Sequence, residues 1–134
     1  MVVGGDGRYG NIAAIKKIIQ ICVAHQVGKV IIPKNGLLST PATSHLIRKE
    51  EAIGGIILSA SHNPGGIEGD FGVKLNTANG GPAAESITNQ IFQCSQSLKS
   101  YKISNIKIPD LDKFGVFSLG ETSLEISLLI LLNF

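Results

Sequence analysis

A serine, a histidine and a lysine stand near one another in the middle of this 134-residue sequence. Ser61 and His62 open the run 61–66, which reads Ser-His-Asn-Pro-Gly-Gly, and Lys74 follows shortly after it. A hydroxyl on a constrained loop, with an imidazole and an ammonium nearby, is suited to carrying a phosphoryl group. His62 can donate to a phosphate or transfer a proton, and Lys74 supplies a compact positive charge.

Glycine and proline shape the loop that would carry this phosphate. Glycine backbone can approach phosphate oxygens closely because no Cβ intervenes, and the loop contains Gly65, Gly66, Gly69 and Gly72. Pro64 fixes its own φ and favours an extended Asn63, so the chain is expected to turn after Ser61. The alternative is that Asn-Pro-Gly-Gly is only a turn, with Ser61 and His62 as polar residues flanking it.

Strands and helices are expected to alternate along the chain around this loop. Short apolar runs bounded by glycine, proline or asparagine predict strands at 1–4, 30–32, 56–59 and 71–75. Helices are predicted from 11 to the stop at Gly28, from 40 to about 52 and from 82 to about 98, with Asn11 and Thr40 as caps and Pro41 and Pro82 at first helical positions.

This order predicts an α/β fold with a mixed, mostly parallel sheet and helices on both faces, that is, three α/β/α layers. The short gap between strands 56–59 and 71–75 favours one antiparallel pair. Ser61 follows strand 56–59 directly, and ligands of such sheets gather at the carboxyl ends of the strands.

The pattern weakens beyond Ser100. Residues 101–108 alternate well enough to predict a strand, and 109–121 are predicted to form a loop. The Leu-rich segment 128–132 is far shorter than the ~20 residues that span a bilayer. It is predicted to be a helix or strand cut off before its partner, which either packs intramolecularly or leaves an exposed edge.

Composition agrees with a single α/β domain. The chain is 43% hydrophobic, contains 16 glycines and carries a formal charge of +2, which is too small to indicate a nucleic-acid or membrane surface. Cys22 and Cys94 both fall on apolar faces of predicted helices and are expected to be buried free thiols. They indicate a reducing compartment, so we expect a cytoplasmic protein.

The residues around Ser61 resemble the phosphoserine loop of the α-D-phosphohexomutases, in their phosphoglucomutase branch. The resemblance rests on 59–66 (Ser-Ala-Ser-His-Asn-Pro-Gly-Gly), 69–76 (Gly-Asp-Phe-Gly-Val-Lys-Leu-Asn) and 79–82 (Asn-Gly-Gly-Pro). Residues 2–9 (Val-Val-Gly-Gly-Asp-Gly-Arg-Tyr) and 35–42 (Asn-Gly-Leu-Leu-Ser-Thr-Pro-Ala) resemble earlier segments of the family in the same order. A collinear match of this length is more specific than any single short motif.

The resemblance implies an isomerase that interconverts glucose 1-phosphate and glucose 6-phosphate through glucose 1,6-bisphosphate. Ser61 would carry the phosphate that is donated and then recovered. His62 and Lys74 match family positions beside that serine, where the ammonium would stabilise charge and one of the two would assist proton transfer. Arg8 matches a family residue at the edge of the substrate cleft. Its alternative role is structural, as a partner of Asp6 or Asp70.

The resemblance also implies Mg²⁺, which the family holds with an Asp-x-Asp-x-Asp loop of its second domain and one oxygen of the phosphoserine, here Ser61. No Asp-x-Asp-x-Asp occurs in this sequence, and the family's sugar-specificity loop and terminal phosphate-binding domain are also absent. We therefore expect a fragment without mutase turnover of its own.

The expected domain organisation follows from the same resemblance. Residues 1–100 would be the family's N-terminal phosphoserine domain without its first strand, and 101–134 a linker and the truncated start of the next domain. Expected partners are a hexose phosphate and the missing domains of the same enzyme, with neither nucleic acid nor membrane. Two alternatives remain: a non-catalytic relative serving as a structural or adhesion-associated binding module, and an unrelated small anion-binding α/β domain.

Overall fold

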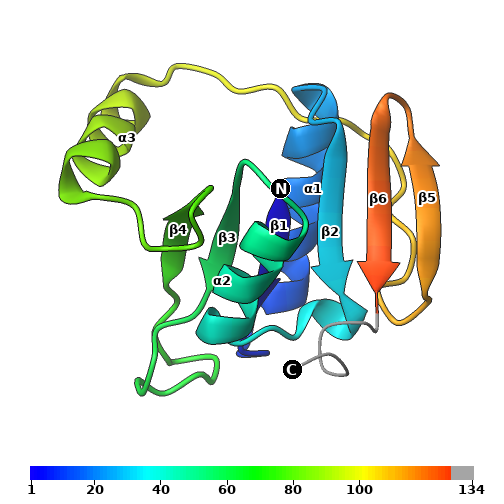
Figure 1. Cartoon of the computed structure of the whole chain (residues 1–134). Coiled ribbons are helices and arrows are strands. Elements are labelled where there is room, and N and C mark those ends of the chain that lie inside the picture. Colours follow the sequence, from blue (N-terminus) through cyan, green and yellow to red (C-terminus); the bar gives the residue numbers. More distant parts are fainter. Residues whose placement is uncertain (128–134) are drawn as a thin grey trace.

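Six strands form one mixed sheet in the computed structural model, which describes residues 1–127 (Figure 1). The strands are β1 (Val2–Gly5), β2 (Lys29–Pro33), β3 (Gly54–Leu58), β4 (Val73–Thr77), β5 (Gly115–Leu119) and β6 (Thr122–Ser127). The helices are α1 (Asn11–Ala24), α2 (Thr40–Lys49) and α3 (Glu85–Ser97), with a 3₁₀ turn, η1, at Lys34–Gly36. The order across the sheet is β4-β3-β1-β2-β6-β5.

The predicted fold class is confirmed. β1 runs parallel to β2 and to β3, and β2 runs parallel to β6. The two edge strands run antiparallel to their neighbours: β4 pairs with β3, and β5 pairs with β6. The antiparallel β3–β4 pair is the one expected from the short gap between the two strands.

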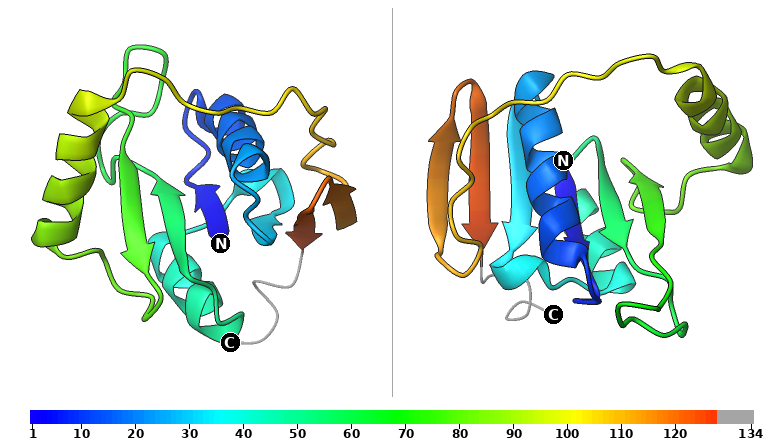
Figure 2. Two further views of the ribbon diagram at one scale, coloured as in Figure 1. Left: turned by 90° about the horizontal axis from the view of Figure 1, so that it is seen from above. Right: turned by 180° about the vertical axis from the view of Figure 1, so that it is seen from behind.

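Helices α1 and α2 cover opposite faces of the sheet (Figures 1 and 2). Alternate side chains of a strand point to opposite faces, and β1 divides in this way between two cores. Val3 packs with Ile15 and Ile19 of α1. Val2 packs on the other face in a cluster that contains Leu46 and Ile47 of α2. The arrangement gives the three predicted layers.

Helix α3 begins at Glu85 and not at the predicted Pro82, which instead forms a bridge with Asn76. The other two helix starts differ by one residue from the prediction. Gly10, with φ of 89°, occupies the N-cap position of α1, and no side chain caps this helix. Asn11 is instead the first helical residue and is buried. In α2 the cap is Ser39, whose Oγ accepts a hydrogen bond from Ala42 N at 3.4 Å, so Pro41 takes the second helical position.

The segment after α3 corrects two predictions. Residues 101–108 form no strand, and Gly115–Leu119, predicted as loop, is β5. The apolar alternation in 101–108 has another cause: Ile106 and Ile108 pack against the core beneath α1. Backbone contacts tie this extended segment down, since Ser104 N donates to Gln20 O at 3.1 Å.

Residues 115–127, predicted within the linker and next domain, complete the same sheet through β5 and β6. Leu111, just before them, is 5% exposed and lies in the core beneath α1. The domain boundary near residue 100 stays a prediction, although these contacts place the described C-terminal part against the N-terminal part. The predicted apolar element at 128–132 lies outside the described residues.

Helix α3 differs from the other two helices because none of its residues is buried. It lies beyond β4, away from α1 and α2 (Figure 2). Ile91 and Phe92 are therefore 49% and 63% exposed. The prediction of a buried thiol holds for Cys22 but is wrong for Cys94, which is exposed on α3. Both cysteines are free, and within residues 1–127 no helix is long and apolar enough to cross a membrane.

Candidate active site

Ser61 lies on an exposed loop that leaves the carboxyl end of β3 and returns to the sheet at β4. Its φ is 57°, in the left-handed region that non-glycine residues rarely adopt. The conformation costs roughly 1–2 kcal/mol for an L-residue, so the surrounding contacts must hold it in place. Such outliers concentrate at functional sites.

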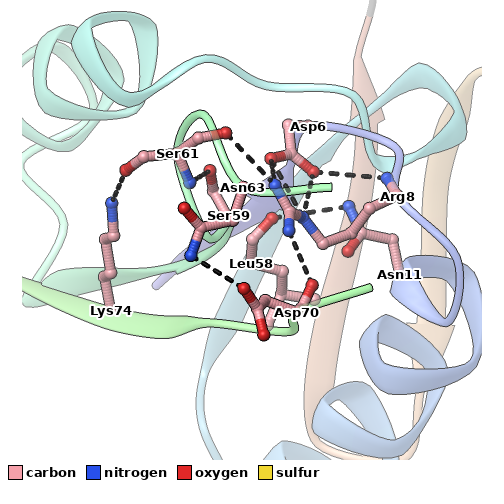
Figure 3. A network of polar contacts seen from close by, with 9 residues as sticks. All are labelled: Asp6, Arg8, Asn11, Leu58, Ser59, Ser61, Asn63, Asp70 and Lys74. Atoms are coloured by element: carbon pink, nitrogen blue, oxygen red, sulfur yellow. Dashed lines mark hydrogen bonds and ion pairs between the residues drawn. The ribbon is translucent and has the colours of Figure 1, made fainter. Parts of the chain in front are cut away.

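Lys74 reaches the Ser61 hydroxyl from the neighbouring strand β4. Its Nζ donates a hydrogen bond to Ser61 Oγ at 2.8 Å (Figure 3). The antiparallel register places Lys74 opposite Ile57 of β3, which brings the lysine back to the end of the strand that leads to Ser61. The sequence predicted these two residues as one site, and the structure brings their reactive atoms together.

Arg8 connects the loop after β1 to the loop of Ser61. Its Nη2 lies 2.7 Å from Asp6 Oδ2, and its Nε donates to Asp6 Oδ1 at 3.0 Å. On its other side Nη1 donates to Asp70 O at 2.6 Å, and Nη2 donates to Ser61 O at 3.4 Å. The pairing of Arg8 with Asp6 is thus confirmed, and substrate binding by Arg8 stays a prediction.

The ion pair between Arg8 and Asp6 changes the titration of both groups. The hydrogen bond from Arg8 lowers the pKa of Asp6 from 3.8 to about 2, with a smaller contribution from the hydroxyl of Ser59. The hydrogen bond to Asp6 raises the pKa of Arg8. Asp6 is therefore ionised throughout the physiological range and neutralises the guanidinium beside it.

Three further polar residues hold the two loops of the site, and none of these contacts was predicted from the sequence. The backbone N–H of Ser61 donates to Ser59 Oγ at 3.1 Å, a local turn in which a serine hydroxyl accepts from the N–H two residues on. Asn63 Nδ2 donates to Asp70 Oδ2 at 2.8 Å. The Asn11 carboxamide, in the orientation that satisfies its neighbours, accepts from Gly7 N at 2.8 Å and Asp6 N at 3.2 Å.

His62 follows Ser61 on the exposed side of the loop. Among the described residues its side chain has neither a hydrogen bond nor an ion pair, so the imidazole is open to solvent or to a ligand. Geometry alone assigns it no partner, and its catalytic role stays a prediction.

A cavity of about 500 Å³ opens at the carboxyl ends of the parallel strands, the end of the sheet from which the Ser61 loop also leaves. Gly5, Pro33 and Ser127, the last residues of β1, β2 and β6, contribute to its lining, as do Asp6 and Ser39. Its wall is otherwise largely apolar. Asp6 thus stands between this cavity and the loop that carries Ser61.

The described residues do not form a metal site by themselves. They contain no group of three or more His, Cys, Asp and Glu side chains that could hold an ion. The two carboxylates of the network are already engaged, since Asp6 is paired with Arg8 and Asp70 accepts a hydrogen bond from Asn63. The side-chain donors of residues 1–127 therefore do not fit a complete Mg²⁺ coordination shell.

Residues 1–102 match the family model described as phosphoglucomutase/phosphomannomutase, alpha/beta/alpha domain I. The chain belongs to this family. It is 52% identical over 126 residues to the phosphoglucomutase of Aspergillus fumigatus, an alignment that covers 94% of this chain and 23% of the relative. Human phosphoglucomutase-1 is also 52% identical over 126 residues, with 93% of this chain and 22% of the relative covered.

A solved structure of the family has the same fold. The open form of the exocytosis-sensitive phosphoprotein pp63/parafusin, a phosphoglucomutase from Paramecium, superposes with a TM-score of 0.87 at 42% identity. That alignment covers 94% of this chain and 25% of the Paramecium chain. The family predicted from the sequence is confirmed, and the chain spans less than a quarter of the length of the curated relatives named above.

Proposed function

We propose that this chain carries the phosphoserine of a phosphoglucomutase, an isomerase of carbohydrate metabolism that interconverts glucose 1-phosphate and glucose 6-phosphate. The observation that supports it best is the 2.8 Å contact between Lys74 Nζ and Ser61 Oγ. It places a cation at the oxygen that would bear the phosphate, on a loop at the carboxyl end of β3. The 52% identity to phosphoglucomutases supports the same assignment.

The reaction would proceed in two half-reactions at Ser61. In the first, a hydroxyl of the bound hexose phosphate attacks the phosphorus of phosphorylated Ser61. The bond from phosphorus to Ser61 Oγ breaks, a bond to the sugar oxygen forms, and the proton of the sugar hydroxyl passes to Ser61 Oγ. The product is glucose 1,6-bisphosphate, the activating intermediate. In the second half-reaction Ser61 Oγ attacks the other phosphoryl group of the bisphosphate. The bond from that phosphorus to its sugar oxygen breaks, the serine proton passes to the sugar oxygen, and the isomeric monophosphate leaves.

Lys74 and His62 would assist at the oxygen of Ser61. The Lys74 ammonium stabilises the negative charge that develops on Ser61 Oγ when the phosphoryl group leaves, because it already donates a hydrogen bond to that atom. One of these two residues carries the proton between the sugar hydroxyl and the serine. His62 is suited to this step because its imidazole is exposed and histidine is the side chain most often used for proton transfer.

Mg²⁺ would neutralise phosphoryl charge in the complete enzyme, but only one ligand to it is assigned to this chain, an oxygen of phosphorylated Ser61. The other ligands are assigned to the family's second-domain Asp-x-Asp-x-Asp loop, and within residues 1–127 there is no metal-binding cluster. The clamp for the distal phosphate of the sugar is likewise assigned to the missing domains. We expect no turnover from this chain alone, because positioning and charge neutralisation supply most of phosphoryl-transfer catalysis.

The free thiols support a cytoplasmic location for the enzyme. Cys22 and Cys94 form no disulfide with each other, and Cys94 is exposed. Such a thiol persists in a reducing compartment.

A hybrid enzyme tests the proposed activity. In it, this chain replaces the matching 126 residues of the Aspergillus fumigatus phosphoglucomutase. We expect the hybrid to convert glucose 1-phosphate to glucose 6-phosphate in the presence of Mg²⁺ and glucose 1,6-bisphosphate, and the Ser61→Ala hybrid to be inactive. A folded hybrid without activity, whose Ser61 takes up no phosphate, would support the non-catalytic binding module instead.

A further inference from the structure

The guanidinium of Arg8 is almost fully engaged by the protein itself. Four of its five N–H donors have acceptors: Nε and one N–H of Nη2 bond to Asp6, the second N–H of Nη2 to Ser61 O, and Nη1 to Asp70 O. The side chain is 5% exposed. A residue that recognises a substrate phosphate needs free donors and an open face, and Arg8 offers little of either.

The acceptors of Arg8 lie at both ends of the loop that carries Ser61. Ser61 O stands near its beginning and Asp70 O near its end (Figure 3). The backbone adds a third tie, because Tyr9 N donates to Gly65 O at 2.8 Å in the middle of the loop. Arg8 and its neighbour thus hold the loop closed at three points.

Close packing reinforces these bonds. A Cβ at Gly65 would stand 2.9 Å from Arg8 Cβ, so only glycine permits this approach of the two loops. Asp6 fixes the direction of the guanidinium through bonds to Nε and Nη2. The planar fork can satisfy a carboxylate on one side and carbonyl oxygens on the other, which a lysine ammonium cannot reproduce.

From these contacts we infer that Arg8, oriented by Asp6, is a positioning residue for phosphoryl transfer: it holds Ser61 in its left-handed conformation, with Oγ beside Lys74, and does not bind the hexose phosphate. The inference rests on the proposed phosphoglucomutase activity. It chooses between the two roles that the sequence left open for Arg8.

Steady-state kinetics of the hybrid enzyme with Arg8→Lys distinguish the two roles. Positioning predicts a fall in kcat of roughly 10- to 100-fold, since small displacements of a reacting group have effects of this size, with KM for glucose 1-phosphate unchanged. Substrate binding predicts a raised KM with kcat retained. The matched control is Arg48→Lys, at an exposed position of α2, and it should change neither constant.

Asp6→Asn is a second variant with opposite expectations for the two roles. Positioning predicts a lower kcat, because the guanidinium loses the charged partner that orients it. If Arg8 instead binds phosphate, removing the competing carboxylate frees the guanidinium and KM falls. Either a KM effect without a kcat effect, or no effect on kcat in both variants, would overturn the inference.

A crystal structure of the Arg8→Lys hybrid gives a readout that does not depend on turnover. We expect Ser61 to leave the left-handed region and its Oγ to move out of hydrogen-bonding range of Lys74 Nζ, with the sheet unchanged. An unaltered Ser61 would contradict the positioning role even if the hybrid were inactive. Conversely, a displaced Ser61 in a hybrid whose wild-type form takes up no phosphate would retain the positioning role and reject the proposed activity.

Discussion

Lys74 donates a hydrogen bond of 2.8 Å to Ser61, although 13 positions separate the two residues in the chain. The antiparallel pairing of β3 and β4 makes this contact, because it returns the chain beside the strand that leads to Ser61. The intervening loop is held in turn by Arg8 and Asn63, which bond to Asp70 at its far end. Sheet register and loop closure together therefore determine where the Ser61 hydroxyl points.

Backbone strain at Ser61 predicts an unusual order of stability between two variants that both lack the hydroxyl. Because φ of Ser61 is 57°, Ser61→Gly should be more stable than Ser61→Ala by about 1 kcal/mol, the approximate cost of the left-handed region for a residue with a Cβ. Urea unfolding of the two variants measures the difference. Equal midpoints would show that the loop does not hold this residue in the left-handed region.

The ion pair of Asp6 and Arg8 predicts a specific dependence of stability on acid. The pKa of Asp6 is lowered to about 2 in the folded chain, from 3.8. A lowered carboxyl pKa stabilises the folded state above the unfolded pKa, and this contribution is lost as the pH falls through the folded pKa. The stability difference between wild type and Asp6→Asn should therefore be constant above about pH 5 and shrink between about pH 4 and pH 2. A difference that does not change with pH would contradict the pairing.

Leu111 should stabilise the fold although it follows a long irregular segment. It is 5% exposed in the core beneath α1, so Leu111→Ala should lower the free energy of unfolding by about 2–5 kcal/mol. Ile91 of α3, 49% exposed, provides the matched control, and Ile91→Ala should change it by less than about 0.5 kcal/mol. Similar losses in the two variants would mean that 101–114 is a detached linker.

Helix α3 should be the least protected of the three described helices. It buries none of its residues, and isolated helices of about this length are marginal in water. Hydrogen exchange measured on the chain should therefore show rapid exchange of amides 89–97 and slow exchange in α1, whose Ile15 and Ile19 are fully buried. Protection in α3 equal to that of α1 would show that its apolar face is covered in solution.

Much of this fold is predictable from the sequence because its signals are local. Apolar runs and glycine or proline boundaries locate β1 to β4 and all three helices to within a few residues. β5 and β6 are the exceptions, since no strand was predicted at either position. Gly115–Leu119 has an exposed Val116 and no clear alternation, and it is a strand because it pairs with β6. A contact with another part of the chain decides its structure, and no local pattern reports that contact.

The candidate site was likewise predictable where the signal is local and not where it depends on contacts between distant residues. Ser61 and Lys74 stand in recognisable motifs, so their types and order predict a phosphoserine site. The ion pair of Arg8 with Asp6 was one of the predicted alternatives. The hydrogen bond from Arg8 to Asp70 O was not predictable, because that residue lies 62 positions away and a backbone carbonyl carries no residue-type signal. The prediction that Cys94 is buried was wrong for a related reason. The apolar periodicity of α3 is present, but no described element covers the apolar face of this helix.

Phosphopeptide mapping of the hybrid enzyme after incubation with glucose 1,6-bisphosphate tests the central claim most directly. The account predicts one phosphoryl group, on Ser61, which is transferred to the sugar when glucose 1-phosphate is added. Phosphate on another residue, or a folded hybrid that takes up none, would contradict the assignment of Ser61 as the phosphate carrier.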